Sequence, residues 1–175
     1  FRTQIAGLGR ILANEYTIYI VLVEAFIGLA DIFTPAAAIR TFLGGRKMNI
    51  LVVDDDRDGR NCVSDFLREM GHEVTECGTG EEALKLFAVQ DFSMVLSDIQ
   101  MPGMSGLELL QKLLKQAPAG NVDIVLFTGF GDMETAIEAL RAGAYDYLLK
   151  PVNIDELVAA TERIAEHQTL RRENK

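Results

Sequence analysis

The stretch NILVVDDD, from Asn49 to Asp56, joins a run of apolar residues to three adjacent carboxylates. Four consecutive aliphatic residues, Ile50 to Val53, predict a strand that is buried on both faces, as strands of parallel sheets are. Charged side chains directly after such a strand lie at its carboxyl end, where doubly wound sheets bind their ligands. The stretch therefore predicts both a core strand of an α/β domain and part of its functional site.

The alternation of short apolar runs with amphipathic helical stretches continues along the chain from Met48. It predicts five βα units in a doubly wound parallel sheet with helices on both faces. The expected strands are 49–53, 73–77, 93–97, 123–127 and 145–149, and the expected helices are about 58–70, 80–89, 106–116, 133–142 and 154–168. Gly71 and Gly143 are expected at positive φ after two of the helices, and Thr79 with Glu82 predicts a capping box.

The residues that follow each strand indicate the strand order. The second strand ends in Cys77 and Gly78 and offers nothing reactive, as expected for the edge strand of a sheet in the order 2-1-3-4-5. The other four strands end in polar residues: Asp54 to Asp56, Asp98, Thr128, and Lys150 with Pro151. One such residue is usually a turn or a cap, but four on the ends of four strands are a specific signal for a site.

The strand ends predict a site for a divalent cation and a phosphoryl group. Carboxylates converging from two adjacent strands repel one another in a partly desolvated cleft, which implies a cation among them. Oxygen ligands suit Mg²⁺ or Mn²⁺, and the absence of a Cys or His cluster argues against zinc. Lys150 adds a positive charge and Thr128 a hydroxyl. Asp98 stands alone after its strand and is the best candidate nucleophile for an acyl phosphate.

Charge and cysteine content exclude other classes of protein. The net charge is −9, without a basic stripe, which argues against nucleic-acid contact by this segment. The two cysteines, Cys62 and Cys77, lack the spacing of a metal site and are expected to be reduced thiols in a cytoplasmic protein.

Residues 1–47 differ from the rest of the chain. They carry 5 basic and 3 acidic residues, whereas residues 48–175 carry 12 and 23. The apolar run 16–33 predicts a helix, but Glu24 and Asp31 interrupt it, and each would cost roughly 2.5 to 3.5 kcal/mol at a membrane centre. Three interpretations fit the segment: translated sequence upstream of a natural start at Met48, a soluble helical appendage, or a membrane anchor, which the two charges disfavour.

Three stretches of the chain resemble the receiver domains of response regulators in two-component signalling. They are ILVVDDD (50–56), VLSDIQMPGMSGLELL (95–110) and IVLFTGFGDMETAIEALRAGAYDYLLKPVN (124–153). The resemblance extends over residues 48–166 and implies a flavodoxin-like receiver fold, with 167–175 as the start of a linker or tail. It is closest to receivers at the front of enhancer-binding transcription activators, where an ATPase and a DNA-binding module follow, so the chain is expected to be a single-domain receiver or a fragment cut before its effector.

The resemblance also implies a role for each site residue. Asp98 matches the phosphoacceptor, which takes a phosphoryl group from a sensor histidine kinase or a phosphotransfer protein. The implied Mg²⁺ ligands are Asp55 directly, Asp54 through water, Asp98, and the backbone carbonyl of Gln100. The remaining matches are Thr128 as the switch hydroxyl, Lys150 as the partner of the phosphoryl group, Lys150-Pro151 as a cis peptide bond, and Tyr147 as the aromatic rotamer switch.

The implied switch changes a surface. Phosphorylation adds negative charge that draws Thr128 inward, and Tyr147 turns into the space it leaves. This remodels the surface formed by the helix 133–142, the strand 145–149 and the helix 154–168, which a partner or a second copy of the chain is expected to read. Gln100 and Phe130 flank the path of water to the phosphoryl group, and we expect Phe130 to slow autodephosphorylation.

Two other interpretations compete with a non-enzymatic switch. A Mg²⁺-dependent phosphohydrolase of the haloacid dehalogenase type also uses an aspartate nucleophile, but it needs an Asp two residues later, where this chain has Gln100. A membrane-tethered receiver would use residues 1–47 as its anchor. We interpret Asp56 as a helix-start residue rather than a ligand, and His72 and His167 as solvated or packed side chains outside the cleft.

Overall fold

The computed structural model describes residues 47–117, 121–129 and 133–173. The predictions for the segment before Lys47 and for Phe130 lie outside these residues. Among the described helices, none is both long and apolar enough to cross a membrane.

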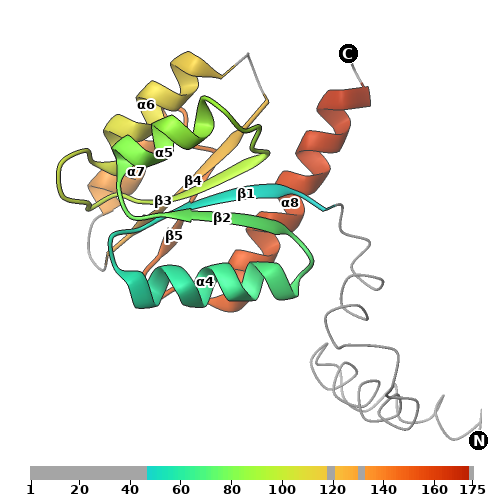
Figure 1. Ribbon diagram of the computed structural model, residues 1–175, viewed down its shortest axis with the longest axis horizontal. Coiled ribbons are helices and arrows are strands. Elements are labelled where there is room, and N and C mark those ends of the chain that lie inside the picture. The colour runs from blue at the N-terminus through green and yellow to red at the C-terminus, as the bar shows by residue number, and fades with distance from the viewer. Residues whose placement is uncertain (1–46, 118–120, 130–132, 174–175) are drawn as a thin grey trace, which may run out of the picture. The chain divides into compact units, whose positions relative to one another are not determined.

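Five strands form one parallel sheet in the order β2-β1-β3-β4-β5 (Figure 1), which confirms the predicted order. The strands are β1 Asn49–Val53, β2 Glu73–Cys77, β3 Met94–Asp98, β4 Asp123–Thr128 and β5 Asp146–Leu149. The helices are α4 Arg57–Glu69, α5 Gly80–Phe87, α6 Gly106–Gln116, α7 Met133–Arg141 and α8 Ile154–Glu173. The predicted fold class, a doubly wound α/β domain, is therefore confirmed.

The apolar residues of the sheet divide between two cores. Ile50 and Val52 pack with side chains of α4 and α8, whereas Leu51 and Val53 pack with side chains of α5, α6 and α7. Figure 1 shows the corresponding layers, with α4 and α8 on one face of the sheet and α5, α6 and α7 on the other. Successive strand residues point to opposite faces, so a strand between two helical layers must be apolar at every position. This explains the uninterrupted run from Ile50 to Val53.

The glycines and caps that end and begin the helices agree with the sequence in part. Gly71 and Gly143 have φ of 91° and 104°, as predicted. The Thr79 side chain accepts a hydrogen bond from the backbone N–H of Glu82 at 3.2 Å, which is one half of the predicted capping box. A complete capping box instead starts α6, where Ser105 and Glu108 exchange bonds of 3.1 and 3.2 Å.

Several element boundaries differ from the sequence prediction. Asp98 and Thr128 are the last residues of β3 and β4, not the first residues after them, because Asp98 pairs with Phe127 and Thr128 with Leu149. The last helix runs to Glu173, beyond the expected end at 168. Its final turns are held by side-chain contacts to the sheet that the sequence pattern does not show.

Candidate functional site

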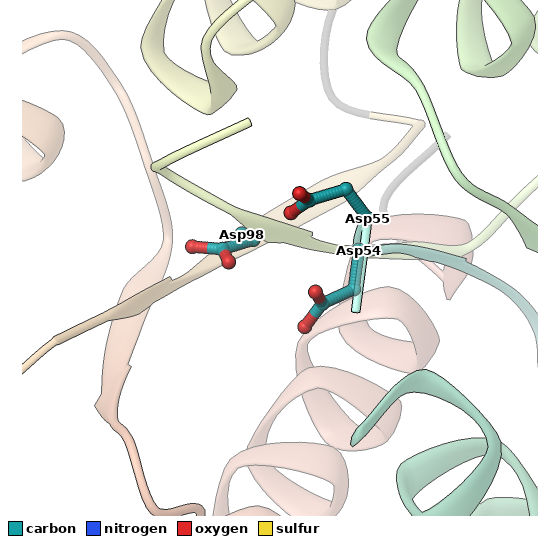
Figure 2. A group of neighbouring side chains, drawn as sticks. All are labelled: Asp54, Asp55 and Asp98. Atoms are coloured by element: carbon teal, nitrogen blue, oxygen red, sulfur yellow. The ribbon is translucent and has the colours of Figure 1, made fainter. Parts of the chain in front are cut away.

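Three carboxylates meet at the carboxyl ends of β1 and β3. Val53 pairs with Ser97, so Asp54 and Asp98 follow from neighbouring positions of two adjacent strands. One carboxylate oxygen from each of Asp54, Asp55 and Asp98 lies within 4.8 Å of the others, and Figure 2 shows the three side chains gathered at these strand ends. Asp54 and Asp98 are buried, and Asp55 is exposed.

Lys150 bridges the two buried carboxylates, Asp54 and Asp98, by hydrogen bonds. Its Nζ donates to Asp54 Oδ2 at 2.8 Å and to Asp98 Oδ2 at 2.6 Å. Its backbone N–H donates to the carbonyl of Thr128 at 2.8 Å, and the peptide bond to Pro151 is cis. The lysine from the end of β5 therefore reaches across β4 to the ends of β1 and β3.

The pKa of Lys150 is raised above its ordinary value. Burial favours the neutral amine and would lower the pKa, but hydrogen bonds and charges from Asp54 and Asp98 outweigh burial. The ammonium therefore stays charged at neutral pH and partly neutralises the carboxylates around it.

Backbone N–H groups bind the remaining oxygens of the buried carboxylates. Asp54 Oδ1 accepts from Asp56 N at 2.9 Å, and Asp98 Oδ1 accepts from Gln100 N at 3.0 Å. In contrast, the Asp55 carboxylate has no hydrogen bond or ion pair to any described residue. Asp54 and Asp98 are thus fixed by direct contacts, and Asp55 is directed by its backbone alone.

The residues fit a divalent cation by charge and by chemistry. The formal charges of the three aspartates exceed that of Lys150 by two, and all the side-chain donors are oxygens, as Mg²⁺ and Mn²⁺ prefer. Asp55 on the exposed side leaves a route for a hydrated ion, which Mg²⁺ needs because it keeps several waters. The cluster is therefore suited to Mg²⁺, and the backbone carbonyl of Gln100 as a ligand stays a prediction.

Thr128 and Tyr147 lie on β4 and β5, the two strands that follow β3 in the sheet. Thr128 is buried at the end of β4, and its hydroxyl lies 3.5 Å from the carbonyl of Gly129. Tyr147 pairs with Leu126 across β4 and β5 and is partly buried. The structure thus places Thr128 next to the strand of Asp98, while the switching roles of Thr128 and Tyr147 stay predictions.

The side chains of Asp56 and of the two histidines are not part of the cluster. Asp56 is the N-cap of α4 and accepts bonds from Asp58 N and Gly59 N, as expected for a helix-start residue. His72 is buried, and Met48 N lies 3.4 Å from its Nδ1. Desolvation lowers the pKa of His72.

His167 belongs to a cluster around Asp123 at the amino end of β4. Asp123 is buried and accepts from Gln168 Nε2 at 2.6 Å, and its Oδ2 lies 3.0 Å from His167 Nδ1. Arg171 Nη1 lies 3.9 Å from Asp123 Oδ1. These contacts hold the last turns of α8 against the sheet and explain why the helix continues past residue 168.

Sequence reasoning missed two residues that touch the acidic cluster. Arg60 donates from Nη1 to the backbone carbonyl of Asp54. Gly106 lies so close to the carbonyl of Asp98 that a Cβ at this position would be 2.1 Å from the oxygen. A basic residue on an amphipathic helix usually faces solvent, so Arg60 gave no signal, whereas a glycine at a helix start could have indicated a close approach of two backbones.

Comparison with known proteins agrees with the fold and shows the family. Residues 50–162 match the family model of the response regulator receiver domain. The chain is 37% identical over 127 residues to the C4-dicarboxylate transport transcriptional regulatory protein DctD of Rhizobium meliloti, covering 73% of this chain and 27% of that protein. It is also 37% identical over 120 residues to the transcriptional regulatory protein ZraR of Escherichia coli, covering 69% of this chain and 27% of that protein. The chain therefore spans about a quarter of the length of the curated relatives it matches.

Solved structures of response regulators resemble this chain in both fold and sequence. NtrX from Brucella abortus aligns with a TM-score of 0.68 at 37% identity, over 73% of this chain and 29% of that one. The receiver domain of a Francisella response regulator aligns with a TM-score of 0.63 at 31% identity, over 69% of this chain and 98% of that one. With its sheet order, its acidic cluster and its bridging lysine, the chain belongs to the response regulator receiver domain family.

Proposed function

We propose that the chain is the phosphoacceptor switch of a two-component phosphorelay and that Asp98 carries the phosphoryl group. The observation that carries the proposal is the position of Lys150, whose Nζ lies between Asp98 and Asp54 with Asp55 beside them. The positive charge of Lys150 beside three carboxylates supports the proposal, because a phosphoryl group on Asp98 would add further negative charge there. The donor is a sensor histidine kinase or a phosphotransfer protein.

The reaction is an in-line displacement at phosphorus. A carboxylate oxygen of Asp98 forms the new P–O bond while the P–N bond of the phosphohistidine breaks, and the imidazole leaves with the electron pair of that bond. Lys150, already bonded to Asp98 Oδ2, is within reach of the transferred oxygens and offsets their charge. The chain turns over no other substrate; its chemistry is limited to its own phosphorylation and dephosphorylation.

Asp54, Asp55, Asp98 and the backbone carbonyl of Gln100 would hold Mg²⁺, with Mn²⁺ as a substitute. When bound, the ion neutralises charge on the transferring phosphoryl group. The chain's own contribution is to fix Asp54 and Asp98 by hydrogen bonds and to leave Asp55 exposed for the ion.

The output of the switch is a change in the surface of α7, β5 and α8. Thr128 moves to donate its hydroxyl to the phosphoryl group, and Tyr147 turns into the space that it leaves. Exposed apolar side chains already lie on this surface, namely Ile137, Leu140, Leu149 and Ile154. A partner or a second copy of the chain reads this surface.

The names of the relatives support a role in transcription, and the cysteines support a location in the cytoplasm. DctD and ZraR are transcriptional regulatory proteins, so we infer that this receiver controls transcription in the cytoplasm, where Cys62 and Cys77 stay reduced. The receiver segment itself makes no contact with nucleic acid in this proposal, because its charge is acidic.

The test is incubation with acetyl phosphate and Mg²⁺, followed by mass spectrometry of the intact protein. Wild type is expected to gain one phosphoryl group, and Asp98→Asn is expected to gain none. Asp91→Asn is the matched control, because it removes an exposed carboxylate that lies before the same strand. An adduct that persists in Asp98→Asn would contradict the proposal, and continuous release of phosphate from a phosphate monoester would favour a phosphohydrolase.

A further inference from the structure

Arg60 on α4 contacts the peptide group that joins two aspartates of the acidic cluster. Its Nη1 donates to the backbone carbonyl of Asp54, which belongs to the peptide between Asp54 and Asp55. The arginine side chain is only 16% exposed, so this contact is partly buried.

Glu76 on β2 holds the guanidinium from the other side. Arg60 Nε lies 3.6 Å from Glu76 Oε2, and Nε is buried with no hydrogen-bond partner in the described part of the chain. The other oxygen of Glu76 accepts from Arg68 Nη2 at 2.6 Å, so Glu76 is itself fixed. The guanidinium is therefore held between the end of β1 and the end of β2.

Asp55 depends on this contact more than Asp54 does. Asp54 is fixed by Asp56 N, by Lys150 Nζ and by its own N–H, which donates to the carbonyl of Cys77 at 3.3 Å. The Asp55 carboxylate has no such contact with any residue that the structure describes. Its direction is set by the peptide plane before it, which is the plane that Arg60 binds.

We propose that Arg60 is a positioning residue that fixes the Asp54–Asp55 peptide and so aims the Asp55 carboxylate at the cation site beside Asp98. The inference rests on the proposed function of the cluster as a Mg²⁺ site. Arg60 would thus support the binding of a divalent cation by positioning Asp55, although its own positive charge opposes that binding.

Charge and geometry predict opposite effects when Arg60 is removed. If only charge mattered, losing a positive group near the cluster would strengthen the binding of a divalent cation. If Arg60 positions Asp55, its loss frees the peptide and weakens binding, by about tenfold for a group that supports a metal ligand. The direction of the change in cation affinity therefore distinguishes positioning by Arg60 from a purely electrostatic effect.

The experiment measures Mn²⁺ affinity by electron paramagnetic resonance of the free ion, with Mg²⁺ in competition. Arg60→Met and Arg60→Lys are both expected to bind Mn²⁺ about tenfold more weakly than wild type. Methionine removes the hydrogen bond to the Asp54 carbonyl, and lysine keeps the charge but not the planar guanidinium that makes the bond. Arg57→Met is the matched control: it removes an exposed positive charge from the same helix, and its affinity is expected to stay the same or rise slightly.

A third variant guards against misfolding of the Arg60 variants. Glu76→Gln keeps Arg60 and weakens only its support on β2, so it is expected to lower Mn²⁺ affinity in the same direction by a smaller factor. Equal or tighter binding in Arg60→Met overturns the inference, and so does wild-type affinity in Arg60→Lys.

The same measurement separates this inference from the proposed function. Wild type must bind Mn²⁺ and Asp55→Asn must lose most of that binding. If wild type shows no binding that depends on Asp55, the proposed metal site fails and the inference fails with it. If wild type and Asp55→Asn behave as expected and the Arg60 variants match wild type, only the role of Arg60 is refuted.

Discussion

Replacing Gly106 with alanine is expected to destabilise the domain by about 3 kcal/mol, at the upper end of the usual cost of overpacking. Gly106 is the first residue of α6, and its N–H donates to the carbonyl of Ile99 at 3.0 Å. The new Cβ would lie 2.1 Å from the carbonyl oxygen of Asp98 and 2.9 Å from both Asp98 C and Ile99 Cα. A carbon and an oxygen in contact lie about 3.3 Å apart, so the two backbones must separate by roughly 1 Å.

The cost is high because backbone meets backbone at this position. A flexible side chain could turn away, but the end of β3 is fixed by the pairing of Asp98 with Phe127. Moving β3 displaces Asp98 itself, and moving α6 disturbs its capping box. We therefore expect Gly106→Ala to lower the rate of phosphorylation by acetyl phosphate as well, even where the variant is fully folded.

Urea denaturation measures the stability, and two other glycines serve as controls. With a slope of about 1.5 to 2 kcal/mol per molar urea, the midpoint of Gly106→Ala should fall by roughly 1.5 to 2 M. Gly80 is also the first residue of its helix, but its Cβ would meet side-chain atoms of Met104, not backbone, at 2.9 to 3.0 Å, so we expect a loss of about 1 kcal/mol, at the lower end of the cost of overpacking. A Cβ on Gly129 would meet nothing within 4 Å, so Gly129→Ala should change stability by less than about 0.5 kcal/mol.

The order of the three variants tests the reasoning. If Gly106→Ala were as stable as Gly129→Ala, or lost no more than Gly80→Ala, the contact with the Asp98 backbone could not be the cause.

Three further predictions concern residues outside the acidic cluster. Asp123→Ala should cost about 3 kcal/mol and speed amide hydrogen exchange in the last turns of α8, since it leaves the buried Gln168 and the partly exposed His167 without their partner; unchanged exchange there would contradict it. Burial lowers the pKa of His72, so the stability that His72 contributes is present above its ordinary pKa of 6.5 and is lost as the pH falls through the pKa of the folded state. The urea midpoint of wild type should therefore fall more between about pH 7 and pH 5 than the midpoint of His72→Gln. Burial raises the pKa of Cys77 to about 12, so iodoacetamide at about pH 8 should label the exposed Cys62 alone in the native protein; rapid labelling of both would refute this.

The fold could be predicted from the sequence because local pattern and burial agree along the sheet. The run from Ile50 to Val53 is apolar at every position because both faces of β1 are covered. The acidic cluster was predictable for the same reason, since Asp54 and Asp98 end adjacent strands and parallel strands end at the same edge.

The contacts that sequence reasoning did not predict join residues through the fold and leave no local pattern. Asp123 reads as an ordinary strand-start residue, but the structure buries it against His167 and Gln168. Arg60 is separated by six residues from Asp54, and only the packing of α4 on the sheet shows that it binds the Asp54 carbonyl. The boundary of β3 was one residue out because the ladder to β4 includes Asp98.

The contacts of Asp123 bear on the proposed switch, because β4 joins Asp123 to Thr128. Thr128 lies at the carboxyl end beside the acidic cluster, and Asp123 lies at the amino end beneath the last turns of α8. A six-residue strand buried along its whole length is stiff, and a buried hydrogen-bonded carboxylate is costly to release. In the proposed switch, a rearrangement that begins at Thr128 therefore leaves the last turns of α8 bound to the sheet. A partner would then recognise changed surface side chains and not a displaced helix.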